Sequence, residues 1–255
     1  MQIQRVLLTP LQLANVPKDE RAFLVLLAHI QNEVNVLNKL LACCTKIEPG
    51  IRSQVHTGNC QALVLCRTLI GKLHEAWNAI QEGFFKSKLS KQYEGLLQEP
   101  AASALSQLKN YFGKKNLITS VRNTFAFHYS LEQAGALVQA DTDPEELAIY
   151  LHAHVGNSLY QFAEFALNKA LLDSIVSADP ALAMDRMLTE MSFVVARVNE
   201  FGQGMMMVIL DKFVGDVVLR QSAEQMELHH VPKFSEVRIP FFIEMPESSP
   251  TSGDA

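Results

Sequence analysis

The sequence contains few of the residues that hold a small or secreted scaffold together. Its 255 residues include only four cysteines, Cys43, Cys44, Cys60 and Cys66, and these form no Cys-x-x-Cys pair. They lie in apolar helical context, where reduced cysteines usually serve as small core residues. A chain of this length buries a sizeable core without disulfides or a structural metal. The composition therefore excludes a stapled scaffold.

The chain also lacks a long apolar run and a large excess of one charge. It carries 22 Lys and Arg against 27 Asp and Glu, which argues against coating nucleic acid or membranes by net charge alone. The longest apolar stretch, near 191–210, is interrupted by Arg197, Asn199 and Glu200, whereas a membrane span needs about 20 nearly continuous apolar residues. The first residues lack the pattern of a secretory signal. We therefore expect a cytoplasmic protein without a transmembrane segment.

Signatures of common enzyme classes are absent as well. No P-loop, no Gly-x-Gly-x-x-Gly after a strand and no Gly-x-Ser-x-Gly elbow is present. Metal-ligating residue types occur only as isolated pairs: His29 with Glu33, Glu227 with His230, and His152 with His154. None of these pairs completes a site. We expect neither a metal nor a cofactor.

Apolar residues recur at spacings of three and four, which is the period of a helix rather than of a strand. The first two stripes are Phe23, Leu26, Ile30, Val34, Leu37 and Leu41, then Leu63, Cys66, Ile70, Leu73, Trp77 and Ile80. Pro49 and Gly50 break the pattern between them. The sequence therefore predicts an all-α, up-and-down helical bundle that begins with a helix hairpin.

Further helices follow the hairpin. One is expected from about Ala101 to Phe112, and another begins near Asn116. Asp143 before Pro144, and Asp179 before Pro180, have the form of N-caps that start helices. The last of these helices carries a heptad stripe: Met184, Met187, Met191, Val194, Val198, Phe201, Met205 and Val208. This stripe fits either the core of the bundle or a dimer seam.

One segment of this acidic chain is basic. Residues 84–122 hold seven cations and two acids, whereas the rest of the chain holds 15 cations and 25 acids. The seven cations are Lys86, Lys88, Lys91, Lys109, Lys114, Lys115 and Arg122. The segment can receive a polyanion, or it is simply a solvated lysine-rich loop.

A short motif ends the basic segment. The sequence Val-Arg-Asn-Thr-Phe-Ala-Phe-His-Tyr over 121–129 contains Arg122, Asn123 and, after four residues, His128. Arg-Asn-x-x-x-x-His resembles the signature of the HEPN superfamily (higher eukaryotes and prokaryotes nucleotide-binding). Six steps along an ideal α-helix separate Arg122 from His128 by roughly 120° and about 9 Å. A cleft between helices or between two copies is therefore needed to bring them to one phosphate.

The resemblance implies metal-independent cleavage of RNA, with the ribose 2′-hydroxyl attacking the adjacent phosphorus. His128 would move protons, Arg122 would hold the phosphate and Asn123 would orient either partner. Lys114 and Lys115 would bind the substrate. The implied partners are RNA, including tRNA, a second copy of the chain, and an antitoxin protein in a toxin–antitoxin or phage-defence setting.

The resemblance also suggests a division of the chain. Residues 1–140 would form the HEPN-like bundle, residues 141–230 would add long helices that pack on it or form a dimer seam, and residues 231–255 would form an extended, Pro/Ser-rich tail. A polar stripe on the second helix, made of Arg67, Gly71, His74, Asn78 and Gln81, either lines the same cleft or is a solvated face. The alternative function is a non-catalytic helical module that binds a nucleotide or a protein.

Overall fold

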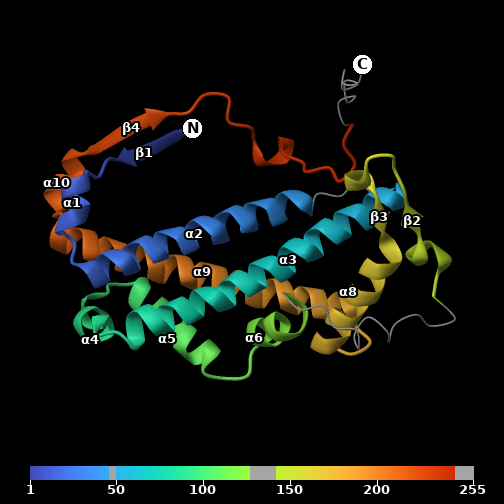
Figure 1. The fold of residues 1–255 in the computed structure, drawn as a ribbon, viewed down its shortest axis with the longest axis horizontal. Coiled ribbons are helices and arrows are strands. Elements are labelled where there is room, and N and C mark those ends of the chain that lie inside the picture. Colours follow the sequence, from blue (N-terminus) through green and yellow to red (C-terminus); the bar gives the residue numbers. More distant parts are fainter. Residues whose placement is uncertain (46–49, 127–141, 245–255) are drawn as a thin grey trace, which may run out of the picture.

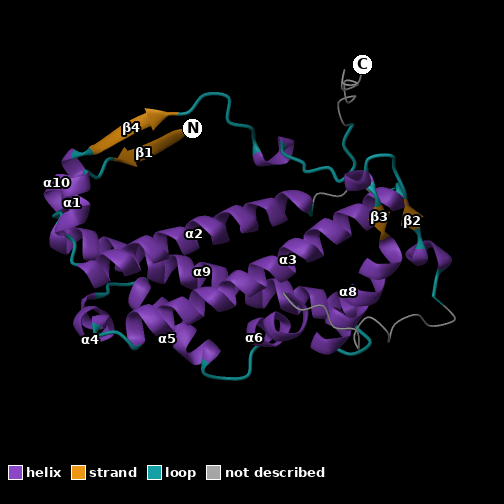
Figure 2. Ribbon diagram, in the orientation of Figure 1, coloured by secondary structure: helices purple, strands orange, loops and turns teal. Residues whose placement is uncertain are grey.

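Three long helices form the centre of the molecule. The computed structural model describes residues 1–45, 50–126 and 142–244. The long helices are α2 (Lys18–Cys44), α3 (Arg52–Ile80) and α9 (Pro180–Phe213), which lie along the long axis of the molecule (Figure 1). Helices dominate and the strands are short (Figure 2). The structure confirms the predicted all-α fold.

Shorter helices complete the bundle. They are α1 (Pro10–Asn15), α4 (Leu89–Tyr93), α5 (Ala101–Phe112), α6 (Leu117–Val121), α8 (Gln161–Ile175) and α10 (Asp216–Gln221). The described residues include two π-helical turns, Gln81–Phe85 at the end of α3 and Arg122–Ala126 after α6. In Figure 1, α4, α5 and α6 line the lower side of the long helices, and α5 packs against α9.

The predicted stripe on α3 lies in the core, because all six of its residues are buried. Among them, Trp77 stacks on Phe112 of α5 with ring centroids 4.9 Å apart. The stripe on α2 is only partly correct, since Leu26 is 38% exposed and Leu24 and Leu27 are buried instead. The hairpin between the two helices is confirmed, with Gly50 at a φ of +121° in the connection.

The heptad stripe of α9 belongs to the core of this chain. Its six central members, from Met187 to Met205, are buried against neighbouring helices, and Met184 and Val208 are partly buried. Asp179 caps the helix as predicted, because its side chain accepts a hydrogen bond from the backbone N–H of Leu182 at 2.9 Å. By length and composition α9 is apolar enough to cross a membrane, but its apolar face is the packed centre of the bundle.

The sequence prediction is wrong at Asp143. Its side chain does accept a hydrogen bond from the backbone N–H of Glu145, yet only a 3₁₀ turn follows (Pro144–Leu147). Two short antiparallel strands come next, β2 (Ile149–Tyr150) and β3 (Leu159–Tyr160). An N-cap and a proline can start one turn of helix. Here no apolar stripe follows that would pack a longer helix against the core, so the helix does not continue.

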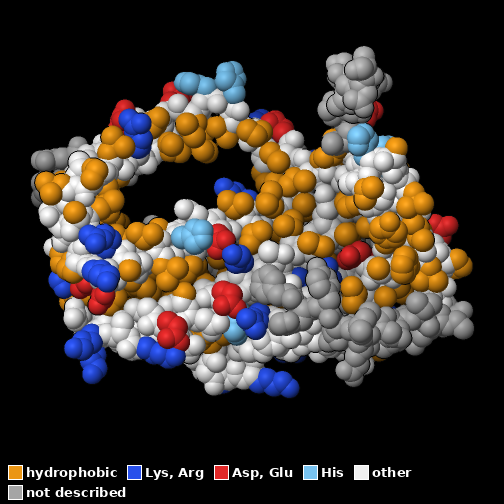
Figure 3. Space-filling model, viewed as in Figure 1, with side chains coloured by type: hydrophobic (Ala, Val, Ile, Leu, Met, Phe, Trp, Pro, Cys, Tyr) orange, Lys and Arg blue, Asp and Glu red, His pale blue; other side chains and the backbone are white. Residues whose placement is uncertain are grey.

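The first strand of the chain pairs outside the bundle with a strand that follows α10. Strand β1 (Gln2–Val6) pairs antiparallel with β4 (Ala223–Glu227), and Arg5 forms an ion pair with Glu224 at 2.5 Å. Beyond β4 the chain runs above α2 in Figure 1 toward the start of α3. The side chain of Asn157 holds this segment through both the N–H and the C=O of Ile243. Figure 3 shows an opening between the segment and the bundle.

Candidate functional site

The predicted site begins where α6 ends. The Asn116 side chain caps α6 by accepting a hydrogen bond from the backbone N–H of Thr119 at 2.8 Å. Leu117, Ile118 and Val121 are buried, so the short helix is fixed by its apolar face. The chain then widens into the π-helical turn of residues 122–126, a geometry that is frequent at functional sites.

Arg122 is held by a carboxylate from α3. Its Nε and Nη2 lie 3.1 and 2.8 Å from Oε1 of Glu75, and its Nη1 lies 3.2 Å from Oδ1 of Asn123. The structure therefore brings Arg122 and Asn123 together. A guanidinium has five N–H groups, and these contacts use three of them. The Arg122 side chain is 31% exposed, and no other described residue accepts a hydrogen bond from its two remaining N–H groups.

Polar residues of α3 support this pair. The Nδ2 of Asn78 lies 3.3 Å from Oε2 of Glu75 and 3.2 Å from Nδ1 of His74. Burial by itself would raise the pKa of Glu75, but the hydrogen bonds from Arg122 and Asn78 outweigh it and the pKa falls below its ordinary value. Glu75 is therefore a stable anion that orients Arg122. Part of the predicted polar stripe, His74 and Asn78, belongs to this network.

Of the other predicted members of the polar stripe, Gly71 is buried, Gln81 is exposed, and Arg67 has its partners on α8. Arg67 donates to Oδ1 of Asn168 at 3.0 Å and lies 3.4 Å from Oε2 of Glu164, both on α8. The Arg67 side chain is only 14% exposed. This part of α3 therefore faces a neighbouring helix and not solvent.

The third member of the motif, His128, lies outside the described residues. The described part of the motif ends at Ala126, and Phe125 packs against the hydrophobic core. The angle of 120° between Arg122 and His128 assumed an ideal α-helix, and the π-helical turn changes that assumption. What the structure does place is the Arg-Asn half of the motif, at the junction of α3 and α6.

The basic segment divides into paired and unpaired cations. Within it, Lys86 pairs with Glu82 and Lys109 pairs with Glu94, in addition to Arg122. Four other lysines have no carboxylate within 4 Å in the described part of the chain: Lys88, Lys91, Lys114 and Lys115. The unpaired lysines keep an unneutralised positive charge that can attract an anion.

Lys114 and Lys115 lie at two adjoining pockets, which share Lys115, Asn116 and Arg186 and together form a two-lobed cleft. One lobe, of about 340 Å³, is lined by Lys115, Ser120 and Val121 and by Ser174 of α8. The other, of about 350 Å³, is lined by both lysines. Arg186 of α9 borders both lobes. Lys and Arg side chains project along the lower edge of the face in Figure 3, where α4, α5 and the α5–α6 loop lie.

Arg122 does not itself line this cleft. It follows Val121, which does, but its side chain turns to Glu75 on α3. The predicted substrate-binding lysines precede the short helix α6, and the predicted phosphate-binding arginine follows it and pairs with α3. A substrate that contacts both has to extend beyond the cleft to reach Arg122.

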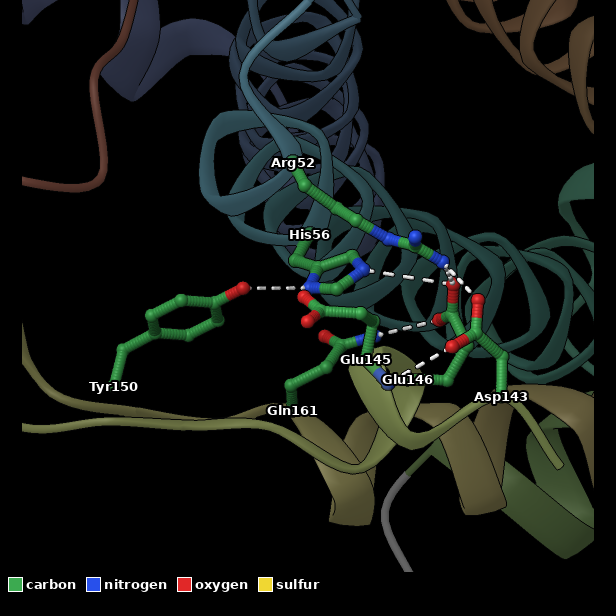
Figure 4. Close-up of polar contacts among 7 residues, drawn as sticks. All are labelled: Arg52, His56, Asp143, Glu145, Glu146, Tyr150 and Gln161. Atoms are coloured by element: carbon green, nitrogen blue, oxygen red, sulfur yellow. Dashed lines mark hydrogen bonds and ion pairs between the residues drawn. The ribbon is translucent and has the colours of Figure 1, made fainter.

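Sequence reasoning missed a second polar cluster, which Figure 4 shows. His56 of α3 is 3% exposed, with Nδ1 3.0 Å from the Tyr150 hydroxyl and Nε2 3.5 Å from Oε1 of Glu146. Arg52, one turn earlier, pairs with Asp143 at 2.5 Å and with Glu146 at 3.4 Å. The available signal was the i,i+4 spacing of Arg52 and His56.

This second cluster fastens the segment after residue 142 to α3. The backbone N–H of Glu145 and the Arg52 guanidinium hold the pKa of Asp143 below its usual range. Burial raises the pKa of the Tyr150 hydroxyl, and the Glu145 charge adds to this. Both ring nitrogens of His56 are engaged by these neighbours. The arrangement is that of a structural ion network.

Neither cluster contains the ligands of a metal. Across residues 1–45, 50–126 and 142–244, no three His, Cys, Asp or Glu side chains are grouped so that they could hold a metal ion. The cysteines are free, and burial raises the pKa of the Cys66 thiol to about 12. No protein family model, curated protein or solved structure matches the chain.

Proposed function

We propose that this protein is a cytoplasmic, metal-independent endoribonuclease of the HEPN type, which acts as a homodimer in a toxin–antitoxin or phage-defence role. The observation that carries the proposal is the Arg122–Asn123 pair, anchored by Glu75 in a π-helical turn, with two guanidinium N–H groups that bond to none of the described residues. A fixed, partly exposed guanidinium suits the recognition of a phosphate.

The proposed reaction needs a phosphate clamp and a group that moves protons. The 2′-hydroxyl oxygen attacks the adjacent phosphorus, the bond to the 5′-oxygen breaks, and a cyclic phosphate and a 5′-hydroxyl are left. One proton leaves the 2′-hydroxyl and one reaches the 5′-oxygen. His128 has the right ordinary pKa, about 6.5, for either transfer. Arg122 would stabilise the charge that grows on the phosphate oxygens.

Two features set the role of Arg122 apart from that of the lysines. Because Glu75 neutralises its charge, Arg122 contributes orientation more than long-range attraction. Lys114 and Lys115 keep their charges and would draw RNA toward the site. A second copy of the chain, and an antitoxin protein that covers this basic face, are the partners that the proposal includes.

The test is cleavage of total RNA and purified tRNA, with EDTA present throughout. We expect the wild type to cut and His128→Ala to be slower by about 10²–10⁴-fold, the usual contribution of general acid–base catalysis. Arg122→Lys should also be slow, because a lysine cannot reproduce the fork held by Glu75 and Asn123. Lys39→Ala, which removes an exposed lysine of α2 outside the basic segment, is the matched control and should cut normally.

Two results would count against the proposal. Cleavage by His128→Ala at the wild-type rate would show that the motif is not the catalytic centre. Folded wild-type protein that cuts no RNA would favour the non-catalytic binding module. Light scattering on a size-exclusion column gives the oligomeric state, and a strict monomer at micromolar concentration would contradict a site shared between two copies.

A further inference from the structure

The two-lobed cleft beside α6 has features that go beyond an attraction for anions. It gathers residues from α5, the α5–α6 loop, α6, α8 and α9. The part from α8 and α9 lies outside the segment that carries the Arg-Asn motif. Its chemistry is mixed: three cations, one carboxylate, several neutral polar side chains and two aromatic rings.

The cations of the cleft outnumber its acids. Glu190 is the one carboxylate among the lining residues, and Tyr111 and Arg186 already satisfy it, at 2.7 Å from the hydroxyl and 3.0 Å from Nε. Lys114 and Lys115 have no acidic partner within 4 Å in the part of the chain that the structure describes. The cleft therefore keeps an excess of two positive charges for a ligand.

Arg186 has the geometry to bind a phosphate. Its Nε is used by Glu190, but among the described residues no acceptor is bonded to its terminal nitrogens. The side chain is 55% exposed. An arginine fixed on one edge, with its terminal N–H groups free, can bind a phosphate through two parallel hydrogen bonds.

Aromatic surface lies in the same lobe. Phe193 of α9 is 37% exposed although it is a large apolar residue, and its ring centroid lies 5.9 Å from that of Tyr111. The Tyr111 hydroxyl is fixed by Glu190, so this ring pair has a defined orientation. An exposed ring beside phosphate-binding cations is the arrangement on which unpaired bases stack.

We infer that the two-lobed cleft binds single-stranded RNA, with Lys114, Lys115 and Arg186 on the phosphates and Phe193 stacked on a base. The inference rests on the proposed function, because the strand that enters this cleft is the one that would continue to Arg122. The paired bases of a duplex offer no free face to Phe193. The cleft therefore selects single strands, and the selecting residues belong to α9.

The experiment measures binding without cleavage. The probe is a fluorescein-labelled 12-nucleotide RNA with 2′-O-methyl groups throughout, which cannot react through its 2′-oxygen. Fluorescence anisotropy gives the affinity of the full chain over a series of salt concentrations, with the same sequence as a duplex in a second arm. Circular dichroism confirms that each variant is folded.

The variants separate the two kinds of contact. Lys114→Ala, Lys115→Ala and Arg186→Gln should each weaken binding and reduce the slope of log K against log salt by about 0.7, the value for one phosphate contact with a single strand. Phe193→Ala should weaken binding by about 5- to 100-fold with the slope unchanged. Lys39→Ala on α2 and Phe162→Ala on α8 are matched controls, because Lys39 is exposed outside the basic segment and Phe162 is 40% exposed.

Each outcome decides the inference. Wild-type affinity in the cleft variants would overturn it, even if the protein cuts RNA. Two other results would also overturn it. One is a loss of binding in the cation variants with no effect of Phe193→Ala, and the other is equal affinity for the duplex. In either case the cleft would bind any polyanion. If the variants show the expected changes in RNA binding but the wild type cuts no RNA, the cleft binds single strands as inferred and only the proposed catalysis is refuted.

Discussion

The close packing of α9 on α5 depends on Gly204, and a Gly204→Ala substitution, which adds one methyl group, tests it. A Cβ added at Gly204 would lie 2.3 Å from the Cβ of Ala101, the first residue of α5. Carbon atoms in contact normally lie about 3.5–4.0 Å apart. The Ala101 methyl group cannot rotate away, so one of the two helices must shift.

The expected effect follows from two opposing contributions. Overpacking a well-filled core costs about 1–3 kcal/mol. Ala is favoured over Gly in a helix interior by about 1 kcal/mol, which partly offsets that cost. Gly204→Ala should therefore lower the free energy of unfolding by about 1 kcal/mol. Without the clash, the same substitution would raise it by a similar amount, so the sign is decisive.

A second substitution isolates the contact. Ala101→Gly removes the opposing methyl group and leaves the new Cβ 3.7 Å from the Cα of residue 101, an ordinary contact distance. The double variant should therefore be more stable than the sum of the two single effects, by about 1–3 kcal/mol. Gly202→Ala is the comparison in the same helix, because its new Cβ meets a side chain and not another helix: Nε2 of Gln31 at 2.8 Å, which would move at the expense of its hydrogen bond to the C=O of Asn199.

Urea unfolding gives these free energies. Circular dichroism at 222 nm follows the helices, and the fluorescence of Trp77, the single tryptophan, follows the contact between α3 and α5 through its stacking on Phe112. A Gly204→Ala protein more stable than the wild type, or no rescue by Ala101→Gly, would refute the close approach of α9 to α5.

Two further predictions concern α3. Leu73→Ala should lower the free energy of unfolding by about 2–5 kcal/mol, because Leu73 is fully buried, and a loss below about 1 kcal/mol on urea titration would contradict that burial. Glu75→Gln should cost about 0.5 kcal/mol at pH 7, as expected for a half-exposed pair with Arg122. The folded pKa of Glu75 is lowered, so its contribution is present above the ordinary pKa and is lost as the pH falls through the folded value. The difference between the two proteins should vanish in acid, and a constant difference would refute the linkage.

Most of the helices could be predicted because their signals are local. The period of the apolar residues gave α2, α3 and α9, and the bounds of α5 match the predicted Ala101 to Phe112. The limit of this reasoning shows on α2, where Leu26 was predicted to be buried but Leu24 and Leu27 are buried instead. A stripe fixes which residues can face inward, but the neighbours on two sides of α2 decide how wide the buried face becomes.

Pairing between distant segments could not be predicted. Strand β1 meets β4 more than 200 residues later, and neither strand has the alternating pattern of a half-buried sheet, since both are largely exposed. The Glu75–Arg122 pair joins residues of unlike charge on two helices. Glu75 is the single acidic residue of α3, but nothing in the sequence shows that α3, and not another helix, supplies the partner of Arg122. Such partners are set by the packing of helices.

The same packing determines how the basic region would act in the binding that we propose. On α6, the buried face of Val121 fixes the backbone, and the next residue, Arg122, reaches α3 while Lys115, near the start of the helix, reaches the cleft. Because Glu75 neutralises the charge of Arg122, Arg122 can orient a bound anion but attracts it little from a distance. Lys114 and Lys115, which stay unpaired among the described residues, attract an anion from a distance but do not orient it. A polyanion drawn by Lys114 and Lys115 would thus be oriented only where it meets the anchored arginines, Arg186 in the cleft and Arg122 beyond it.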